Sequence, residues 1–496
     1  MNIALLLQMA AEAGGDRTGL VCDGRRWSYS ELFEAAQRAA VVFRDSGAAY
    51  VALLDESSEA APIALFGAAL AGIPYVPLNY RLADADLGAL IDRIEPALLI
   101  GDATRASAIA SKTPKALSRS DFQTALKSVS AETVDDPEQP IAAQIFTSGT
   151  TSAPKAALLK HTNLMGYILG TVEFMSAAEE EAALVCVPPY HIAGIAALLS
   201  SIYSMRKLVL LPAFTPEAWL DLVEAERVTN AFVVPTMLAR IVAAQESGHS
   251  ADVTSLKALA YGGGRMPREL IEIALDRFPE TGFTNAYGLT ETSSTIALLG
   301  PEDHRLAYAS TDPMVRERLS SVGQPLPTVE IEIRDDNGQI LPAGEPGEIY
   351  VRGEQVSGEY QGKSALIEGG WFPTRDQGYL DGEGYLFLGG RADDVIVRGG
   401  ENMAPAEIED ALSAHPAVQE SAAVGVPSAE WGETVAVAVV LRASAEPISE
   451  VDVKEHIRTS LRSSRVPEYV TFVDALPYNE MGKLLRREIK QWFDVH

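Results

Sequence analysis

A repeated pattern of short apolar runs constrains the fold of this chain more than any other feature. The runs are Tyr50–Ser57, Pro96–Ala103, Ala183–His191, Lys207–Pro212, Thr229–Pro235 and Leu256–Gly264. Each contains an uninterrupted apolar stretch of strand length, and segments of helix length separate them. Because such strands are buried on both faces, the pattern predicts an α/β fold, with parallel sheet covered by helices.

The pattern changes after Ser320. Residues Val329–Gly353 alternate apolar and polar side chains around Asn337-Gly338, a turn signal, which predicts a small antiparallel β region. From about Ala392 onward, two predicted helices (405–413 and 451–461) and three short strands make a segment of domain size. We therefore predict a large domain of mixed βαβ-type sheets over 1–392 and a small, mobile α+β domain over 393–496.

Length and charge limit the class of protein. A chain of 496 residues is too long for one core and predicts two to four domains. Cys22 and Cys186 provide neither a disulfide framework nor metal-ligand spacing, which fits a reducing cytoplasm. The net charge of −28 argues against nucleic acid and anionic membranes as partners, but small anions remain possible because local cations act at short range.

Two apolar segments are not interpreted as membrane or export signals. The first residues place no positive charge ahead of their short apolar run, so they match a signal peptide poorly. The run Ala60–Tyr80 lacks charge, but Pro62, Pro74 and Pro77 interrupt it and small residues dominate it. We predict a buried helix followed by a turn and a strand.

A hydroxyl-rich segment, Thr147–Lys155, follows the predicted strand Ala142–Phe146 and is called the hydroxyl loop below. Its Ser and Thr side chains, the flexible Gly149 and the cation of Lys155 suit a polyphosphate ligand. A P-loop is excluded because Gly-Lys-Ser/Thr does not occur there. On composition alone, a solvated Ser/Thr turn is an equally acceptable interpretation.

Four further segments follow the hydroxyl loop in order: Asn285–Ser294, Gly344–Gly353, Gly370–Glu409 and Asn479–Ile489. Together, and over nearly the whole chain, they resemble the adenylate-forming superfamily of acyl-CoA synthetases, peptide-synthetase adenylation domains and luciferases. The length without a carrier domain is most similar to a stand-alone acyl-CoA or aryl-CoA synthetase. The resemblance implies an AMP-forming ligase that uses ATP, Mg²⁺ and coenzyme A.

The resemblance assigns the phosphates of ATP to the hydroxyl loop. The matching positions are Thr147, Ser148, Gly149, Thr150, Thr151 and Lys155. Ser152 and Ala156 stand where the family usually has glycine. A left-handed backbone at either position would cost about 1–2 kcal/mol, which leaves the exact loop conformation open.

Catalytic roles follow from the same resemblance. Lys483 would bridge the substrate carboxylate and the α-phosphate, because two anions that approach each other need a cation between them. Glu291 would help to hold Mg²⁺, and Thr290 would contact the α-phosphate. An exposed lysine within a basic run is the alternative interpretation of Lys483.

The nucleoside is assigned to a second set of residues. Tyr287 would stack on adenine, and Gly262 and Gly263 would let the backbone approach the base. Asp376 would accept both ribose hydroxyls, with Arg391 as a second ribose contact. A core aromatic is the alternative for Tyr287.

The predicted acyl pocket is small and apolar. Its residues are His191, Ile192, Ala193, Phe232, Gly262, Gly263, Ala286, Gly288 and Ser293. They offer no lysine or arginine for a second carboxylate and no acid for an ammonium group, which favours a neutral fatty or aromatic acyl tail over an amino acid. For His191 a purely structural role is the alternative.

Domain rotation is also implied by the resemblance. Asp393 would be the hinge, since Lys483 must leave before a thiol enters. Gly399 and Gly400 would then form part of the pantetheine channel. Trp431 would pack near coenzyme A, with an exposed structural tryptophan as the alternative.

The sequence therefore predicts a cytoplasmic fatty-acyl or aryl-CoA ligase, with a place in fatty acid metabolism. It forms an acyl-adenylate and then transfers the acyl group to coenzyme A. Two alternatives remain: a ligase that loads a carrier-protein arm, and a non-catalytic binding protein of the same fold. A homodimer is possible.

Overall fold

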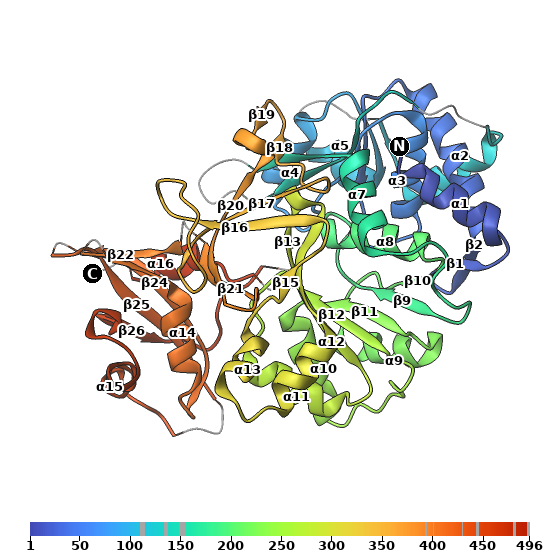
Figure 1. The fold of residues 1–496 in the computed structure, drawn as a ribbon. Coiled ribbons are helices and arrows are strands. Elements are labelled where there is room, and N and C mark those ends of the chain that lie inside the picture. Colours follow the sequence, from blue (N-terminus) through green and yellow to red (C-terminus); the bar gives the residue numbers. More distant parts are fainter. Residues whose placement is uncertain are drawn as a thin grey trace.

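The computed structural model describes residues 1–109, 115–132, 137–147, 154–391, 394–399, 401–428, 430–442, 446–479 and 483–493. Figure 1 shows a large part and, beside it, a smaller part formed by the orange and red end of the chain. The ends of β13 (Gly282–Leu289) and β21 (Leu386–Arg391) lie near the junction between the two parts.

Sheet A forms the lower half of the large part in Figure 1. Its strand order is β15-β14-β13-β12-β11-β9-β10-β1-β2. Besides β13, these strands are β1 (Thr18–Cys22), β2 (Arg25–Ser28), β9 (Ala182–Val185), β10 (Lys207–Leu210), β11 (Asn230–Val233), β12 (Ala258–Gly262), β14 (Ser294–Leu299) and β15 (Gln324–Pro325). Pairing is parallel from β1 to β13 and antiparallel at both edges.

Sheet B lies above sheet A, with the order β19-β18-β8-β7-β4-β3-β5-β6. Its strands are β3 (Tyr50–Leu54), β4 (Tyr75–Pro77), β5 (Ala97–Gly101), β6 (Lys115–Leu117), β7 (Ile141–Thr147), β8 (Lys155–Lys160), β18 (Glu359–Tyr360) and β19 (Lys363–Ser364). From β7 to β6 the strands are parallel, and from β7 to β19 they are antiparallel.

Two antiparallel sheets complete the fold. Sheet C has the order β16-β17-β20-β21 and adds β16 (Val329–Arg334), β17 (Gly347–Gly353) and β20 (Phe372–Leu380). Sheet D belongs to the small part, with β22 (Ile396–Arg398), β23 (Glu401–Met403), β24 (Val418–Ser428), β25 (Gly432–Leu441) and β26 (Tyr469–Phe472). Of these, only β26 pairs in parallel, with β25.

Helices cover the sheets. In the large part they are α1 (Ala4–Gly14), α2 (Tyr29–Ser46), α3 (Ala60–Ala71), α4 (Asp84–Asp92), α5 (Ala103–Ile109), α6 (Arg119–Ser128), α7 (His161–Thr171), α8 (Ile192–Tyr203), α9 (Pro216–Glu226), α10 (Pro235–Glu246), α11 (Arg268–Arg277), α12 (Pro301–Ala309) and α13 (Pro313–Glu317). The small part adds α14 (Pro405–Ser413), α15 (Glu450–Ser460) and α16 (Arg486–Gln491), with α14 on the side that faces α11 and α13.

Local sequence signals explain where several helices begin and end. Ser28 and Glu31 form a reciprocal capping box at the start of α2, and Gly47 ends that helix in the left-handed conformation. Ser449 and Asp452 cap α15 in the same way. The helices therefore start where side chains satisfy the free backbone N–H groups.

The predicted α/β class is confirmed. The run Ala60–Tyr80 forms the buried helix α3 and strand β4, and the predicted helix 405–413 matches α14. The turn at Asn337-Gly338 also forms, but the strand that pairs with β16 begins only at Gly347, after a single bridge at Ile340. The apolar runs do form parallel sheet, whereas both edges of sheet A and the β19 edge of sheet B are antiparallel.

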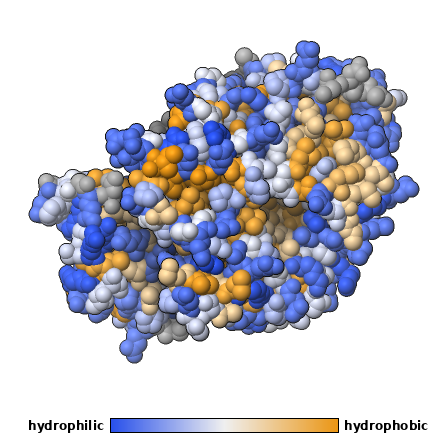
Figure 2. All heavy atoms as spheres, in the orientation of Figure 1, coloured by the Kyte–Doolittle hydropathy of each residue, from blue (hydrophilic) through white to orange (hydrophobic). Residues whose placement is uncertain are grey.

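The surface is largely hydrophilic on the face seen in Figure 2. Apolar residues gather over sheet C, where Ile331, Leu341 and Leu380 are only partly buried. In the part of the chain that the structure describes, each helix is too short or too polar to cross a lipid bilayer.

Candidate active site

A buried charged cluster marks the edge of sheet C. Asp376 on β20 and Arg391 on β21 are register partners, and the Arg391 Nη1 donates to Asp376 Oδ1 at 2.8 Å. The hydroxyl of Tyr287, on β13 of sheet A, donates to the other oxygen, Oδ2, at 2.6 Å. Asp376 is 8 % exposed and Tyr287 is 9 % exposed. The sheets therefore bring together three residues that the sequence assigned to the nucleoside.

Electrostatics follow from this burial. Desolvation raises the pKa of the Tyr287 hydroxyl well above its usual value, and the neighbouring Asp376 carboxylate raises it further. Desolvation disfavours the charged form of Arg391, but the Asp376 carboxylate outweighs it, so that the pKa of Arg391 rises. The Arg391 Nε is buried without a hydrogen-bond partner among the described residues, so a ligand oxygen would satisfy it.

The Tyr287 ring is buried in an apolar cluster and is not an exposed surface for stacking. It belongs to an apolar cluster with Ile296, Ala297 and Val322, close to sheet C. Its predicted contact with adenine stays a prediction. The observed hydrogen bond gives Tyr287 a second role, because its hydroxyl orients the Asp376 carboxylate.

Glu291 lies on the short 3₁₀ turn Thr290–Thr292, directly after β13. It is 8 % exposed, and its Oε1 accepts a hydrogen bond from the Tyr360 hydroxyl at 2.7 Å. The Glu291 carbonyl accepts from the backbone N–H groups of Ser357 and Gly358, at 2.8 and 3.2 Å. Desolvation and then the Glu291 charge raise the pKa of Tyr360, which therefore stays a donor.

These groups fit a magnesium ion bound together with a nucleotide. The described residues contain no group of three or more His, Cys, Asp or Glu side chains that would hold a metal alone. Mg²⁺ is commonly held by one or two carboxylates together with substrate phosphate oxygens and waters. Glu291 provides one such carboxylate, held in place by Tyr360.

The hydroxyl loop connects two paired strands of sheet B. Its first residue, Thr147, is the register partner of its last, Lys155, and the Lys155 ammonium lies 5.7 Å from the centre of the Tyr360 ring. Tyr360, in turn, bonds to Glu291. The exit of the loop thus lies next to the residue that holds the predicted magnesium ligand.

Two strand ends form the expected backbone surface for the base. A Cβ atom on Gly262, at the end of β12, would come within 2.3 Å of the Ala286 carbonyl oxygen on β13 and within 3.6 Å of the Phe232 ring. Gly263 has a φ of 77°, which favours glycine. Glycine is therefore needed at Gly262 to keep β12 and β13 paired.

Lys483 lies in the small domain, next to an isolated β-bridge between Tyr478 and Leu484. The Lys483 N–H donates to the Asn479 side-chain oxygen, and the Asn479 N–H donates to the Lys483 carbonyl, each at 2.9 Å. These bonds fix the backbone of Lys483.

The ammonium of Lys483 interacts with the large domain. Its side chain is exposed, yet desolvation by nearby protein lowers its pKa, and the positive charge of Arg391 lowers it further. Asp376, Asp394 and Glu291 act in the opposite direction. Three of these four groups belong to the large domain, so Lys483 lies within electrostatic reach of the Asp376 cluster and of Glu291.

The predicted acyl residues lie on or directly next to β11, β12, β13, α8 and the 3₁₀ turn Thr290–Thr292. His191 stands directly before α8, with its ring 4.5 Å from that of Tyr190, and Ile192 and Ala193 form the first turn of the helix. All three are partly exposed. They are thus accessible at the start of α8, as lining residues must be.

The remaining acyl positions follow β12 and β13. Ala286 is partly exposed and Gly288 is exposed, whereas Ser293 is fully buried with a φ of 56°. A Cβ atom on Gly288 would come within 1.8 Å of the Ser294 carbonyl, so glycine is required there. The predicted role of Ser293 in the pocket stays a prediction.

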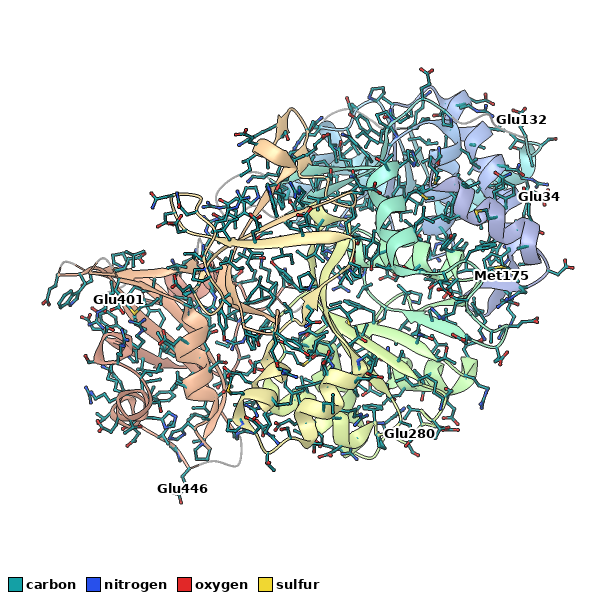
Figure 3. All side chains as sticks on the ribbon, viewed as in Figure 1. Glu34, Glu132, Met175, Glu280, Glu401 and Glu446 are labelled. Atoms are coloured by element: carbon teal, nitrogen blue, oxygen red, sulfur yellow. The ribbon has the colours of Figure 1, made fainter. Side chains whose placement is uncertain are left out.

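The predicted coenzyme A residues pack against one another. The Gly399 N–H donates to the Trp431 carbonyl at 2.9 Å, and a Cβ atom on Gly399 would meet the Trp431 ring at 3.0 Å. Figure 3 shows Glu401, on the strand after this turn, at the outer side of the small domain. Trp431 is 43 % exposed.

Several predicted residues lie outside the described residues. They are Ser148, Gly149, Thr150 and Thr151 of the hydroxyl loop, the predicted hinge Asp393, and Gly400. Their roles stay predictions.

Sequence reasoning missed Tyr360. It lies 69 residues from Glu291 and belongs to β18, a short strand between β19 and β8 of sheet B. No motif marks it, because the contact exists only when β18 pairs with β8. The aromatic residue within this short strand was the single available signal.

Comparison with known proteins agrees with this geometry. The model of the AMP-binding enzyme family matches residues 7–361, and that of the AMP-binding enzyme C-terminal domain matches residues 407–483. The chain is 33 % identical over 485 residues to a feruloyl-CoA synthase of Amycolatopsis sp, covering 95 % of this chain and 94 % of that protein. It is 31 % identical to the fatty acid–[acyl-carrier-protein] ligase ScoC of Streptomyces coeruleorubidus, covering 96 % and 93 %.

A solved structure is similar over almost the whole chain. It is the o-succinylbenzoate CoA synthetase (MenE) of Bacillus subtilis in complex with its acyl-adenylate intermediate, with a TM-score of 0.82, 28 % identity and coverage of 98 % of this chain and 97 % of that one. The same enzyme is also known in complex with ATP and a magnesium ion.

The fold and the clustered residues define an adenylate-forming enzyme. The chain belongs to the AMP-binding enzyme family, with both its main and its C-terminal domain.

Proposed function

We propose that this protein is an AMP-forming acid–thiol ligase, which activates a carboxylic acid with MgATP and transfers the acyl group to coenzyme A. The family membership and the CoA-ligase relatives support this activity. The observation that carries it is the buried cluster in which Tyr287 and Arg391 both donate hydrogen bonds to Asp376, together with the Glu291 carboxylate that Tyr360 holds.

In the first step, a carboxylate oxygen of the substrate attacks the α-phosphorus of ATP. A new O–P bond forms, the bond to the β-phosphate oxygen breaks, and pyrophosphate leaves. Asp376 and Arg391 hold the ribose, and Lys483 offsets the negative charge where the two anions meet. Magnesium neutralises phosphate charge when bound at Glu291.

In the second step, the thiol of coenzyme A attacks the acyl carbon. A C–S bond forms, the C–O bond to the phosphate breaks, AMP leaves, and the thiol proton passes to solvent. We place the domain boundary after residue 392 and the hinge at Asp393, so that the small domain rotates and removes Lys483 between the steps. Gly399, Gly400 and Trp431 would then face the pantetheine arm.

For the substrate, we propose a neutral aromatic acid. The predicted pocket residues bear no permanent charge. The Phe232 ring lies beside Gly262, the strand end at which we expect the acyl group and the adenine base to be bound. The relative named a feruloyl-CoA synthase makes ferulic acid a reasonable first compound. Fatty acids of increasing length are the comparison, because ScoC is named as a fatty acid ligase.

A pyrophosphate-release screen tests both the activity and the substrate. Carboxylic acids are supplied with MgATP, with and without coenzyme A, and thioester formation is followed by chromatography. We expect acid-dependent pyrophosphate release and an acyl-CoA product. Release without any thioester, or a thioester formed only on a holo carrier protein, would favour the carrier-loading alternative that ScoC suggests.

We also propose a cellular compartment and an oligomeric state for the enzyme. Cys22 and Cys186 are both free and buried, and burial raises the pKa of each thiol to about 12, which suits a reducing cytoplasm. We also propose a homodimer, which light scattering of the purified protein would test against a monomer.

A further inference from the structure

One short segment of the large domain makes ion pairs with the small domain. The segment runs from Arg265 to Glu269, directly after Gly262–Gly264, and is called the docking segment below. Arg265 pairs with Asp410 on α14, and its Nη1 also donates to the Ala406 carbonyl at 3.4 Å. In Figure 1, α14 lies on the face of the small domain that is turned toward α11.

The second pair has the opposite polarity. Glu269, in the first turn of α11, accepts two hydrogen bonds from Arg442, at 2.6 and 3.3 Å. Arg442 directly follows β25, and its N–H donates to the Ala417 carbonyl at 3.0 Å. The large domain thus offers a cation and an anion, and the small domain offers their complements.

The Arg265–Asp410 pair is connected, through Glu409 and Arg486, to the segment that bears Lys483. Glu409, next to Asp410, lies 3.9 Å from the Arg265 Nη1. Glu409 also accepts two hydrogen bonds from Arg486, at 2.5 and 2.9 Å, and Arg486 follows Lys483 by three residues. Both Glu409 and Arg486 are largely buried. A buried charged contact therefore joins α14 to Arg486, three residues after Lys483.

We propose that the docking segment holds the small domain in the arrangement that forms the adenylate, with Arg265 and Glu269 as positioning residues for Lys483. This inference rests on the proposed function. The pairs with Asp410 and Arg442 join different domains, so rotation for the thiol step would break both. Their loss then weakens the first step without weakening the second.

The size of the effect follows from exposure. The side chains are 44 % and 62 % exposed in the Arg265–Asp410 pair, and 34 % and 60 % exposed in the Arg442–Glu269 pair. Each ion pair of this kind should change the equilibrium between the docked and undocked small domain by about two- to fivefold. Such weak pairs suit a domain that must dock and leave in every turnover.

The test uses the full-length enzyme and changes the small-domain partners, which lie outside the predicted ATP site. The variants are Asp410→Asn, Arg442→Ala and the double variant, and Arg265→Ala completes a double-mutant cycle with Asp410→Asn. Arg268→Ala is the matched control, because Arg268 lies in the docking segment but pairs with Glu272 of its own helix.

Each half-reaction is measured separately. Single-turnover pyrophosphate release at saturating MgATP reports the first step, and AMP release after coenzyme A is added to pre-formed enzyme-bound adenylate reports the second. We expect about two- to fivefold slower pyrophosphate release for each single variant and a larger loss for the double variant, with unchanged KM for ATP. AMP release should not slow, and Arg268→Ala should match the wild type in both steps.

A charge swap and the dependence on salt concentration provide two further tests of the ion pairs. The swap Arg265→Asp with Asp410→Arg should recover most of the rate that Arg265→Asp alone loses. High salt should slow the wild-type first step and reduce its advantage over the double variant. Circular dichroism melting checks that each variant is folded.

The outcomes separate the two proposals. Absence of pyrophosphate release by the wild type with every acid tested would overturn the proposed function itself. An active wild type whose variants lose both steps equally, lose neither, or fail to respond to the charge swap would overturn the docking role alone.

Discussion

The predicted nucleotide residues of the large domain and the predicted catalytic lysine of the small domain are held in contrasting ways. Asp376, Tyr287 and Glu291 are each less than 10 % exposed, lie in or directly after strands, and have hydrogen-bond partners that are buried or partly buried. Lys483 is exposed, and its backbone exchanges hydrogen bonds with the side chain and the backbone of Asn479. The first group is fixed by the core, whereas the lysine depends on how one domain docks on another.

The two groups of residues would therefore serve different purposes: the buried residues would bind the nucleotide, and Lys483 would act in the reaction. In the proposed mechanism, the buried groups of the large domain would bind the nucleotide in a preorganised arrangement, which costs nothing at the moment of reaction. A cation supplied by a second domain can be withdrawn, so the same adenylate can next meet a thiol. Substitutions in the two regions should therefore fail in different ways.

Removal of the lysine should reduce the activity more than any other substitution considered below. Lys483→Ala should slow acid-dependent pyrophosphate release on the order of a hundred- to a thousandfold, because a cation at the developing charge is lost. Coenzyme A-dependent AMP release from a supplied acyl-adenylate should stay near the wild-type rate. Unchanged pyrophosphate release would remove Lys483 from the mechanism.

Asp376→Asn tests the buried cluster of Asp376, Arg391 and Tyr287. The substitution leaves Arg391 without its carboxylate partner and weakens the ribose site, so both stability and ATP affinity should fall. Arg391 is 31 % exposed, and we expect the low end of the range for broken buried pairs, about 3 kcal/mol of unfolding free energy. Chemical denaturation and the KM for ATP measure the two losses. Stability equal to that of the wild type would show that the pair does not hold sheet C.

Glu291→Gln should change the response to magnesium. Loss of one carboxylate charge should raise the magnesium concentration needed for half-maximal pyrophosphate release by about tenfold. Glu359→Gln is the matched control, since Glu359 is adjacent to Tyr360 but pairs with Lys160. An equal shift in both variants would assign the effect to general charge rather than to a ligand.

Tyr287→Phe should have the smallest effect. It removes the hydroxyl that donates to Asp376 and keeps the aromatic ring, so the loss should be about 1–2 kcal/mol in stability with little change in adenine binding. Thermal melting with and without ATP separates the two. A large rise in the KM for ATP would instead point to a direct role of the hydroxyl in nucleotide binding.

The sequence predicted the elements better than their contacts. Apolar runs such as Lys207–Pro212 and the helix 405–413 were predictable because burial on both faces and helical periodicity leave local patterns. The meeting of Tyr287 with Asp376 was implied by the family resemblance only as two separate roles. Their hydrogen bond depends on how sheet C packs on sheet A, which no local pattern encodes.

Contacts between distant segments were out of reach for the same reason. Tyr360 meets Glu291 only because β18 pairs with β8, and Arg265 meets Asp410 only because the domains dock. Exposed arginines and acids are common on any surface, so neither residue stands out in the sequence.

A crystal structure with a non-hydrolysable acyl-sulfamoyl adenosine tests the central claim most directly. We predict that the ribose hydroxyls bond to Asp376, that the base lies beside Gly262 and Tyr287, and that the Lys483 ammonium contacts the sulfamate. An analogue bound elsewhere, or one held at Asp376 while Lys483 stays out of contact in an adenylate-forming arrangement, would contradict the account.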